Sequence, residues 1–158
     1  MLCPNCGSAK NKVLESRVVD EGLAIRRRRE CLGCNSRFTT YERIEIKHLL
    51  IVKKNGNRET YDRDKLSRGI YKAFEKRPVS GEKIELLISR IEQNMQTPGE
   101  TEILSSVLGE LVVEQLMLAD PVAYVRFASV YRSFADIASF ERELHNIKKQ
   151  NKSNKNVQ

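Results

Sequence analysis

The sequence predicts an α+β protein, in which a small N-terminal β-sheet module precedes a mostly helical domain with a short β-hairpin. Three observations support this fold class. All four cysteines lie within the first 34 residues and form two CxxC pairs. The segments between and after these pairs read as short strands joined by turns. From residue 62 onward, apolar residues recur instead at helical spacing.

The cysteine pairs are Cys3 with Cys6 and Cys31 with Cys34. Two such pairs are typical of four thiolates closing on one tetrahedral ion, and we expect one structural Zn²⁺ per chain. Two disulfides are the alternative, but no signal peptide precedes Cys3 to direct the chain to an oxidising compartment. A catalytic zinc needs an open coordination position, which four cysteines do not leave. A module of about 45 residues buries little apolar surface, so the metal would supply folding free energy.

Three strands are predicted around the second pair, over residues 12–19, 23–30 and 37–41, with a turn at 20–22. Three short strands with a metal at one end form a zinc ribbon. Four consecutive arginines, 26–29, lie on the second strand. Period-two alternation puts Arg26 and Arg28 on one face, with Arg27 and Arg29 on the other.

The positive charge is concentrated at the two ends of the chain. Residues 1–46 hold nine Lys/Arg and six Asp/Glu, residues 47–144 hold fifteen of each, and residues 145–158 hold four lysines and no acid. This distribution favours a polyanion such as nucleic acid as the partner of the ends. The alternative is a solvated basic edge that prevents strand-to-strand aggregation. No apolar run is long enough to cross a membrane, so we expect no membrane partner.

The second part of the chain begins with a hairpin signal. An apolar run at 49–52 is followed by Asn55-Gly56, a strong turn pair, and by residues 58–61. Helices are then predicted from 62, with Asp62 as N-cap, over 80–95, from 105, with Ser105 as cap, from 121, after the cap Asp120, and over 137–147. The Lys/Asn-rich tail from Gln150 is expected to be disordered.

Three lysines converge on the first of these helices. Lys53 and Lys54 end the strand before the turn, and Lys65 lies in the first helical turn, where a cation is disfavoured by the helix dipole. Together they could form a phosphate cradle at the helix N-terminus. They could equally be three ordinary surface lysines. The chain contains no P-loop and no Rossmann glycine motif.

Several segments carry a family resemblance. They are residues 3–6, 26–31, 37–41 and 52–56, then Tyr61, Asp62 and Lys65, and finally 75–80 and 123–134. In these segments the chain resembles the bacterial NrdR repressors of ribonucleotide reductase genes, and the resemblance extends to about residue 147. Members of that family join a zinc ribbon to an ATP-cone, a nucleotide-sensing domain also found on the reductase.

The resemblance implies a division into a zinc ribbon at 1–46, an ATP-cone at 47–137, and a C-terminal helix and basic tail at 138–158. It implies zinc ligation by Cys3, Cys6, Cys31 and Cys34, and DNA binding by Arg17, Arg26, Arg27, Arg28, Arg29 and Arg37. Lys53, Lys54 and Lys65 would hold nucleotide phosphates. The residues around the adenine would be Ile51, Val52, Glu59, Thr60 and Tyr61. Tyr124 and Tyr131 would line the same pocket from the helical side.

The implied function is a cytoplasmic repressor, associated with the nucleoid when it is bound to DNA. ATP and dATP would act as allosteric effectors, and the protein would form homo-oligomers that bind operators upstream of ribonucleotide reductase genes. One departure is visible, because ATP-cones commonly read Lys-Arg-Asp-Gly where this chain has Lys53-Lys-Asn-Gly56. Lys54 keeps the charge of that arginine but loses its planar fork.

Two other classes of function remain as alternatives. An ATP-hydrolysing or nucleotidyl-transfer accessory is disfavoured, because the only histidines, His48 and His145, are far apart and no carboxylate cluster suggests a Mg²⁺ site. We therefore expect no enzymatic activity. A regulator whose ribbon docks onto protein instead of DNA is the other alternative.

Overall fold

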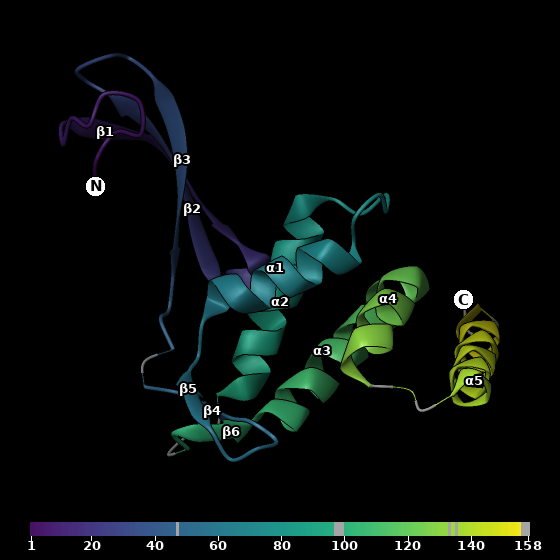
Figure 1. The fold of residues 1–158 in the computed structure, drawn as a ribbon. Helices are drawn as coiled ribbons and strands as arrows, with labels where there is room; N and C mark the ends of the chain where they lie inside the picture. Colours follow the sequence, from purple (N-terminus) through teal and green to yellow (C-terminus); the bar gives the residue numbers. More distant parts are fainter. Residues whose placement is uncertain (47, 97–99, 133, 135, 156–158) are drawn as a thin grey trace. The chain divides into compact units, whose positions relative to one another are not determined.

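The computed structural model describes residues 1–46, 48–96, 100–132, 134 and 136–155 (Figure 1). The chain divides into two units, Met1–Ile46 and Lys47–Gln158, each with its own three-stranded sheet. The first unit is a β-sheet module and the second is mostly helical. The predicted α+β class is therefore confirmed.

The first unit is an antiparallel sheet in the order β1-β2-β3, formed by Asn11–Val19, Ala24–Cys31 and Arg37–Arg43. The predicted turn between the first two strands is a short 3-10 segment, Asp20–Gly22, in which Gly22 has a φ of 99°. That left-handed value favours glycine. A bulge at Leu14 interrupts the pairing of β1 with β2 and increases the local twist.

Few side chains are buried in this unit. Among its described residues, the buried hydrophobic ones are Cys3, Ala24 and Cys31. Most of β1 is exposed, including Val18 at 68%. A sheet with so small an apolar interior needs another source of stability, and two of its three buried hydrophobic residues are predicted metal ligands.

The small sheet of the second unit has the order β5-β4-β6, from Arg58–Thr60, Leu50–Val52 and Glu102–Leu104. The predicted hairpin is confirmed. Gly56 has a φ of 84°, and the Lys53 amide donates to the Asn57 carbonyl at 2.8 Å. Strand β6, which pairs in parallel with β4, was not predicted. This strand is three residues long and its partner lies some fifty residues earlier in the chain, so the local sequence pattern does not predict it.

Five helices follow the hairpin in the described part of this unit: α1 Arg63–Ala73, α2 Gly81–Met95, α3 Ser105–Ala119, α4 Pro121–Tyr131 and α5 Ile137–Lys155. Asp62 caps α1 by accepting from the amides of Asp64 and Lys65, as predicted. Asp120 caps α4 with Pro121 at the first helical position, also as predicted.

Two expectations about helix ends were wrong. Ser105 does not cap α3, because Leu104 occupies the N-cap position and is still paired in β6, so the helix begins at Ser105 itself. Helix α5 continues past Gln150 to Lys155, where disorder was expected. No glycine or proline interrupts residues 137–155, so nothing in the covalent structure ends the helix earlier.

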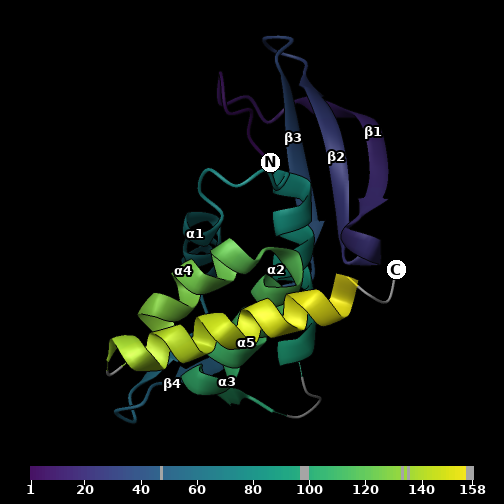
Figure 2. The same cartoon turned by 90° about the vertical axis from the view of Figure 1, so that its right-hand side faces the viewer.

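The core of the second unit lies between the helices. Its buried side chains include Ile70 of α1, Ile88 and Ile91 of α2, Leu116 of α3 and Tyr124 of α4. Helix α5 lies beside α4 (Figure 2). None of the helices in the described part of the chain combines the length and apolar character needed to span a bilayer.

Candidate metal centre, arginine face and nucleotide cavity

The four cysteines of the first unit converge on one point. Their Sγ atoms all lie within 4.8 Å of one another, with Cys3 to Cys34 at 3.7 Å and Cys6 to Cys31 at 3.5 Å. Tetrahedral zinc with Zn–S bonds of about 2.3 Å separates its sulfurs by about 3.8 Å. All four are free thiols. The residues therefore fit one tetrahedral Zn²⁺, and the alternative of two disulfides is wrong.

The two cysteine pairs lie in equivalent turns. Gly7 and Asn35, each directly after the second cysteine of its pair, have φ values of 70° and 57°. Their amides donate to the carbonyls of Cys3 and Cys31 at 2.9 and 3.0 Å. Each turn thus reverses the chain tightly enough to aim two sulfurs at one centre.

Thiol acidity differs sharply within the cluster. Hydrogen bonds with the side chain and backbone of Ser36 lower the pKa of Cys34 to about 5. A backbone hydrogen bond with Ser8 lowers the pKa of Cys6, but the adjacent Cys34 and Cys31 sulfurs outweigh it and raise that pKa to about 12. Four thiolates this close repel one another. Zinc binding would relieve that repulsion with release of protons.

One face of the ribbon sheet gathers arginines from all three strands. Arg17, Arg26 and Tyr41 are direct cross-strand neighbours, and residues opposite one another share a face. Arg28 is two positions along β2 from Arg26, and Arg37 pairs with the next residue of that face, Glu30. Arg17, Arg26, Arg28 and Arg37 therefore share one surface, which we call the arginine face.

Arg26 and Arg28 make no ion pair or hydrogen bond with any residue that the structure describes. The two arginines on the opposite face, Arg27 and Arg29, do have side-chain partners. Arg27 pairs with Glu42, Nε to Oε1 at 3.0 Å, and Arg29 donates to Thr40 Oγ1 at 3.1 Å and to Asn11 Oδ1 at 3.0 Å. The alternation predicted for residues 26–29 is thus present. Arg27 and Arg29 on one face bond to neighbouring strands, whereas Arg26 and Arg28 on the other face have no such partner in the described part of the chain.

The second unit contains a cavity of about 660 Å³. It lies among the β4–β5 hairpin, the first turns of α1 and α3, and the end of α4. Seven of the ten predicted nucleotide-binding residues line it: Ile51, Lys53, Lys54, Glu59, Tyr61, Lys65 and Tyr131. Most of the remaining wall is apolar and was not predicted as a site: Leu66, Gly69, Leu108, Gly109, Val112 and Phe127.

The other three predicted residues do not line this cavity. Strand alternation directs Ile51 and its partner Glu59 toward it, so Val52 and Thr60 belong to the opposite face of the small sheet. Tyr124 is fully buried, and its hydroxyl donates to Glu143 of α5. Burial, followed by that hydrogen bond, raises the pKa of Tyr124. Its role in this structure is to join α4 to α5.

A single carboxylate holds two of the cavity lysines. Glu59 Oε1 accepts from Lys53 Nζ at 2.7 Å and from Lys65 Nζ at 2.8 Å. Hydrogen bonds from Lys53 and then Lys65 lower the pKa of Glu59. Lys53 and Lys65 therefore meet beside the first turn of α1, and Lys54 lines the same cavity. An adjoining cavity of about 840 Å³ shares Lys53, Lys65 and Tyr131 with the first cavity. Its wall also contains the basic residues Lys72, Lys76 and Arg126, which were not predicted as site residues.

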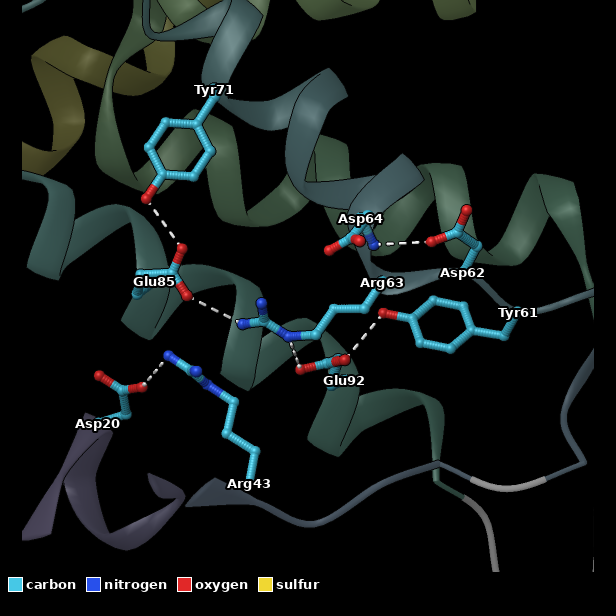
Figure 3. Close-up of polar contacts among 9 residues, drawn as sticks. All are labelled: Asp20, Arg43, Tyr61, Asp62, Arg63, Asp64, Tyr71, Glu85 and Glu92. Atoms are coloured by element: carbon cyan, nitrogen blue, oxygen red, sulfur yellow. Dashed lines mark hydrogen bonds and ion pairs between the residues drawn. The ribbon is translucent and has the colours of Figure 1, made fainter. Parts of the chain in front are cut away.

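A chain of polar contacts holds the side chain of Tyr61 (Figure 3), a residue that lines the cavity. Its hydroxyl donates to Glu92 Oε1 at 2.9 Å, and Arg63 Nε donates to the other oxygen at 3.1 Å. Arg63 also donates to Glu85, which accepts from the Tyr71 hydroxyl as well. Burial, then the negative charge of Glu92, raises the pKa of Tyr61. This network joins α1 to α2.

Tyr131 is held against α3. Its hydroxyl donates to the Ser106 carbonyl at 2.7 Å, and its ring lies over Gly109, where an added Cβ would come within 2.0 Å of the ring. A glycine inside a helical apolar pattern is a signal of such close packing. Gly109 within the apolar pattern of α3 is therefore the feature of the sequence that indicates this contact.

Comparisons with known proteins agree with both units. Residues 1–42 match the family model described as Transcriptional repressor NrdR-like, N-terminal domain, and residues 49–137 match the ATP cone domain. The chain is similar to proteins named Transcriptional repressor NrdR from Myxococcus xanthus and Petrotoga mobilis. It is 57% identical to the first over 91% of this chain and 86% of that protein, and 54% identical to the second over 94% and 99%.

A third relative with the same name, from Streptococcus gordonii, is 50% identical over 94% of this chain and 95% of that protein. These relatives are transcriptional regulators and not enzymes. Coverage of nearly the whole chain, together with the four-cysteine cluster, confirms the resemblance inferred from the motifs. The chain belongs to the NrdR family of transcriptional repressors, with a zinc ribbon followed by an ATP-cone.

Proposed function

We propose that the protein is a zinc-dependent repressor of bacterial ribonucleotide reductase genes, whose binding to operator DNA depends on the adenine nucleotide that it carries. ATP and dATP would be the effectors, and they would act by changing the homo-oligomer that the chain forms. The protein would work in the cytoplasm, at the nucleoid when it is bound to DNA.

The observation that carries this proposal is the arginine face. Arg26 and Arg28 are adjacent on their face and unpaired among the described residues, while Arg17 and Arg37 extend the same surface. Adjacent unpaired cations repel one another, and a phosphate backbone relieves that repulsion with release of counterions. Arg27 and Arg29 are engaged inside the sheet, so we assign them to its stability and not to DNA contact.

The nucleotide part of the proposal rests on the cavity of the second unit. Lys53, Lys54 and Lys65 would hold the phosphates, because they line the cavity close to the N-terminus of α1. Tyr61 and Tyr131 offer aromatic surface for the base. An apolar wall with a few convergent charged groups is what small-ligand sites generally present.

The coupling between the two parts needs only a modest difference in affinity. A nucleotide shifts assembly by as much as it prefers one oligomer over another. A tenfold preference corresponds to about 1.4 kcal/mol, which the gain or loss of one hydrogen bond to a ribose hydroxyl can supply. Two ribbons held together on one duplex would then multiply a weak single-ribbon affinity.

The test measures oligomer size and operator affinity in parallel with ATP, with dATP and without nucleotide, at one stated salt concentration. We expect the affinity to differ at least tenfold between nucleotide states and to follow oligomer size. The proposed mechanism is wrong if operator affinity is the same in all three.

Arginine variants test the DNA face separately. Arg26→Ala and Arg28→Ala should each weaken operator binding. They should also lower the slope of log affinity against log salt, by about 0.9 for every DNA phosphate that the variant no longer neutralises. Arg27→Ala is the matched control, because it removes the same charge from the opposite face. An equal reduction of slope in all three variants, with zinc retained, would contradict the assignment of faces.

A further inference from the structure

The carboxylate of Glu59 lies in the cavity assigned to an anionic ligand. Its oxygen Oε1 is 2.7 Å from Lys53 Nζ and 2.8 Å from Lys65 Nζ, and all three residues line the cavity. The three side chains are 35–58% exposed, so a ligand in solution can reach them. One carboxylate oxygen held by two ammonium groups is in the arrangement that a phosphate oxygen would adopt.

The strand pairing places Glu59 on the face of the small sheet that borders the cavity. Glu59 is the central residue of β5, directly opposite the buried Ile51 of β4, so strand alternation directs its side chain to the cavity side of the sheet. Lys53 follows β4, and Lys65 lies in the first turn of α1. A ligand phosphate and the Glu59 carboxylate would therefore compete for the same two lysines.

We propose that Glu59 is a built-in competitor of the nucleotide phosphates, an affinity-setting residue that must leave the two lysines before a polyphosphate can bind. The inference rests on the proposed nucleotide-binding function and differs from the resemblance, which put Glu59 near the adenine. A ligand with several charged oxygens displaces one carboxylate readily, whereas a nucleoside without phosphates has nothing with which to displace it. Glu59 thereby favours the more highly charged phosphate chain.

The experiment uses the full zinc-loaded chain and two probes, tripolyphosphate and adenosine, titrated by calorimetry into the wild type and Glu59→Gln. Loss of the competing charge should tighten tripolyphosphate binding about fivefold to tenfold at low salt, and the gain should shrink as salt screens the lysines. Adenosine affinity should stay the same. A thermal melt of each variant in the same buffer shows that the variant is folded.

Glu102→Gln is the matched control. Glu102 lies in the same small sheet, pairs with Arg58 at 2.8 Å and is 40% exposed against 39% for Glu59, but it does not line the cavity. The Glu102→Gln substitution removes the same negative charge from a neighbouring position in the small sheet, outside the cavity. Its tripolyphosphate affinity should therefore remain within twofold of the wild type.

Three results would overturn the inference. They are unchanged or weaker tripolyphosphate binding in Glu59→Gln, an equal gain in Glu102→Gln, and a loss of adenosine affinity in Glu59→Gln. If neither the wild type nor Glu59→Gln binds tripolyphosphate, the inference is overturned as well. If ATP binds the wild type while Glu59→Gln changes nothing, only this inference fails. If the wild type does not bind ATP but Glu59→Gln gains tripolyphosphate, the proposed function fails and the competition stands.

Discussion

Replacing Gly109 by alanine should destabilise the helical unit, although the same change inside a helix usually stabilises it. Alanine gains about 1 kcal/mol over glycine in helix propensity. At Gly109, however, the new Cβ would lie 2.0 Å from two ring atoms of Tyr131 and 2.3 Å from its hydroxyl oxygen. The ring must swing away, which breaks its hydrogen bond to the Ser106 carbonyl.

The magnitude follows from these terms. Loss of the hydrogen bond costs about 1 kcal/mol, and displacing a packed ring costs about 1–3 kcal/mol. Set against the propensity gain of about 1 kcal/mol, the net destabilisation is about 1–3 kcal/mol. Tyr131 also lines the cavity, so nucleotide affinity should fall in parallel with stability.

Gly69→Ala supplies the control. Gly69 lies inside α1, and a Cβ there meets only Phe127, at an ordinary contact distance of 3.9 Å. This variant should gain about 0.5–1 kcal/mol. Thermal unfolding followed by the far-ultraviolet helix signal should move the two variants in opposite directions, at about 4 °C per kcal/mol for a unit of this size. A Gly109→Ala protein that melts at or above the wild-type temperature would refute the packing argument.

Three further perturbations probe other parts of the chain. Removing zinc with a chelator should unfold the ribbon and leave the helix signal unchanged, because the ribbon has so little other core; loss of helix signal would contradict this. Burial raises the pKa of Asp120, but hydrogen bonds from Arg77 and two α4 amides outweigh it and leave the pKa below its usual range. The stability from this group should therefore be present above about pH 4 and be lost as the pH falls through the lowered pKa. Asp120→Asn should lose about 1–2 kcal/mol at pH 7 and show a flatter acid limb in pH-dependent urea unfolding; an unchanged limb would count against the pair. Tyr61→Phe, which removes the donor to Glu92, should cost about 1 kcal/mol by urea unfolding, whereas an unaltered midpoint would mean that the hydroxyl contributes nothing.

Features decided by neighbours in the chain were predictable. The spacing of the cysteines indicated one metal site, since each turn needs only a few residues to aim two sulfurs. The caps Asp62 and Asp120 accept hydrogen bonds from amides two and three residues away, so their geometry is local. The Asn55-Gly56 turn is local for the same reason.

The zinc ribbon, the hairpin and the order of the helices could be read from the amino-acid order alone, because these features follow from spacing, caps and periodicity within a few residues. Three features became visible only in the folded chain: β6 pairs with β4, Glu59 bonds to two of the cavity lysines, and Tyr124 is buried against α5 and does not line the cavity. Each of these depends on which distant segment packs against the residue. Strand pairs and ion pairs between distant segments form only when the whole unit packs, so a short stretch of sequence does not predict them.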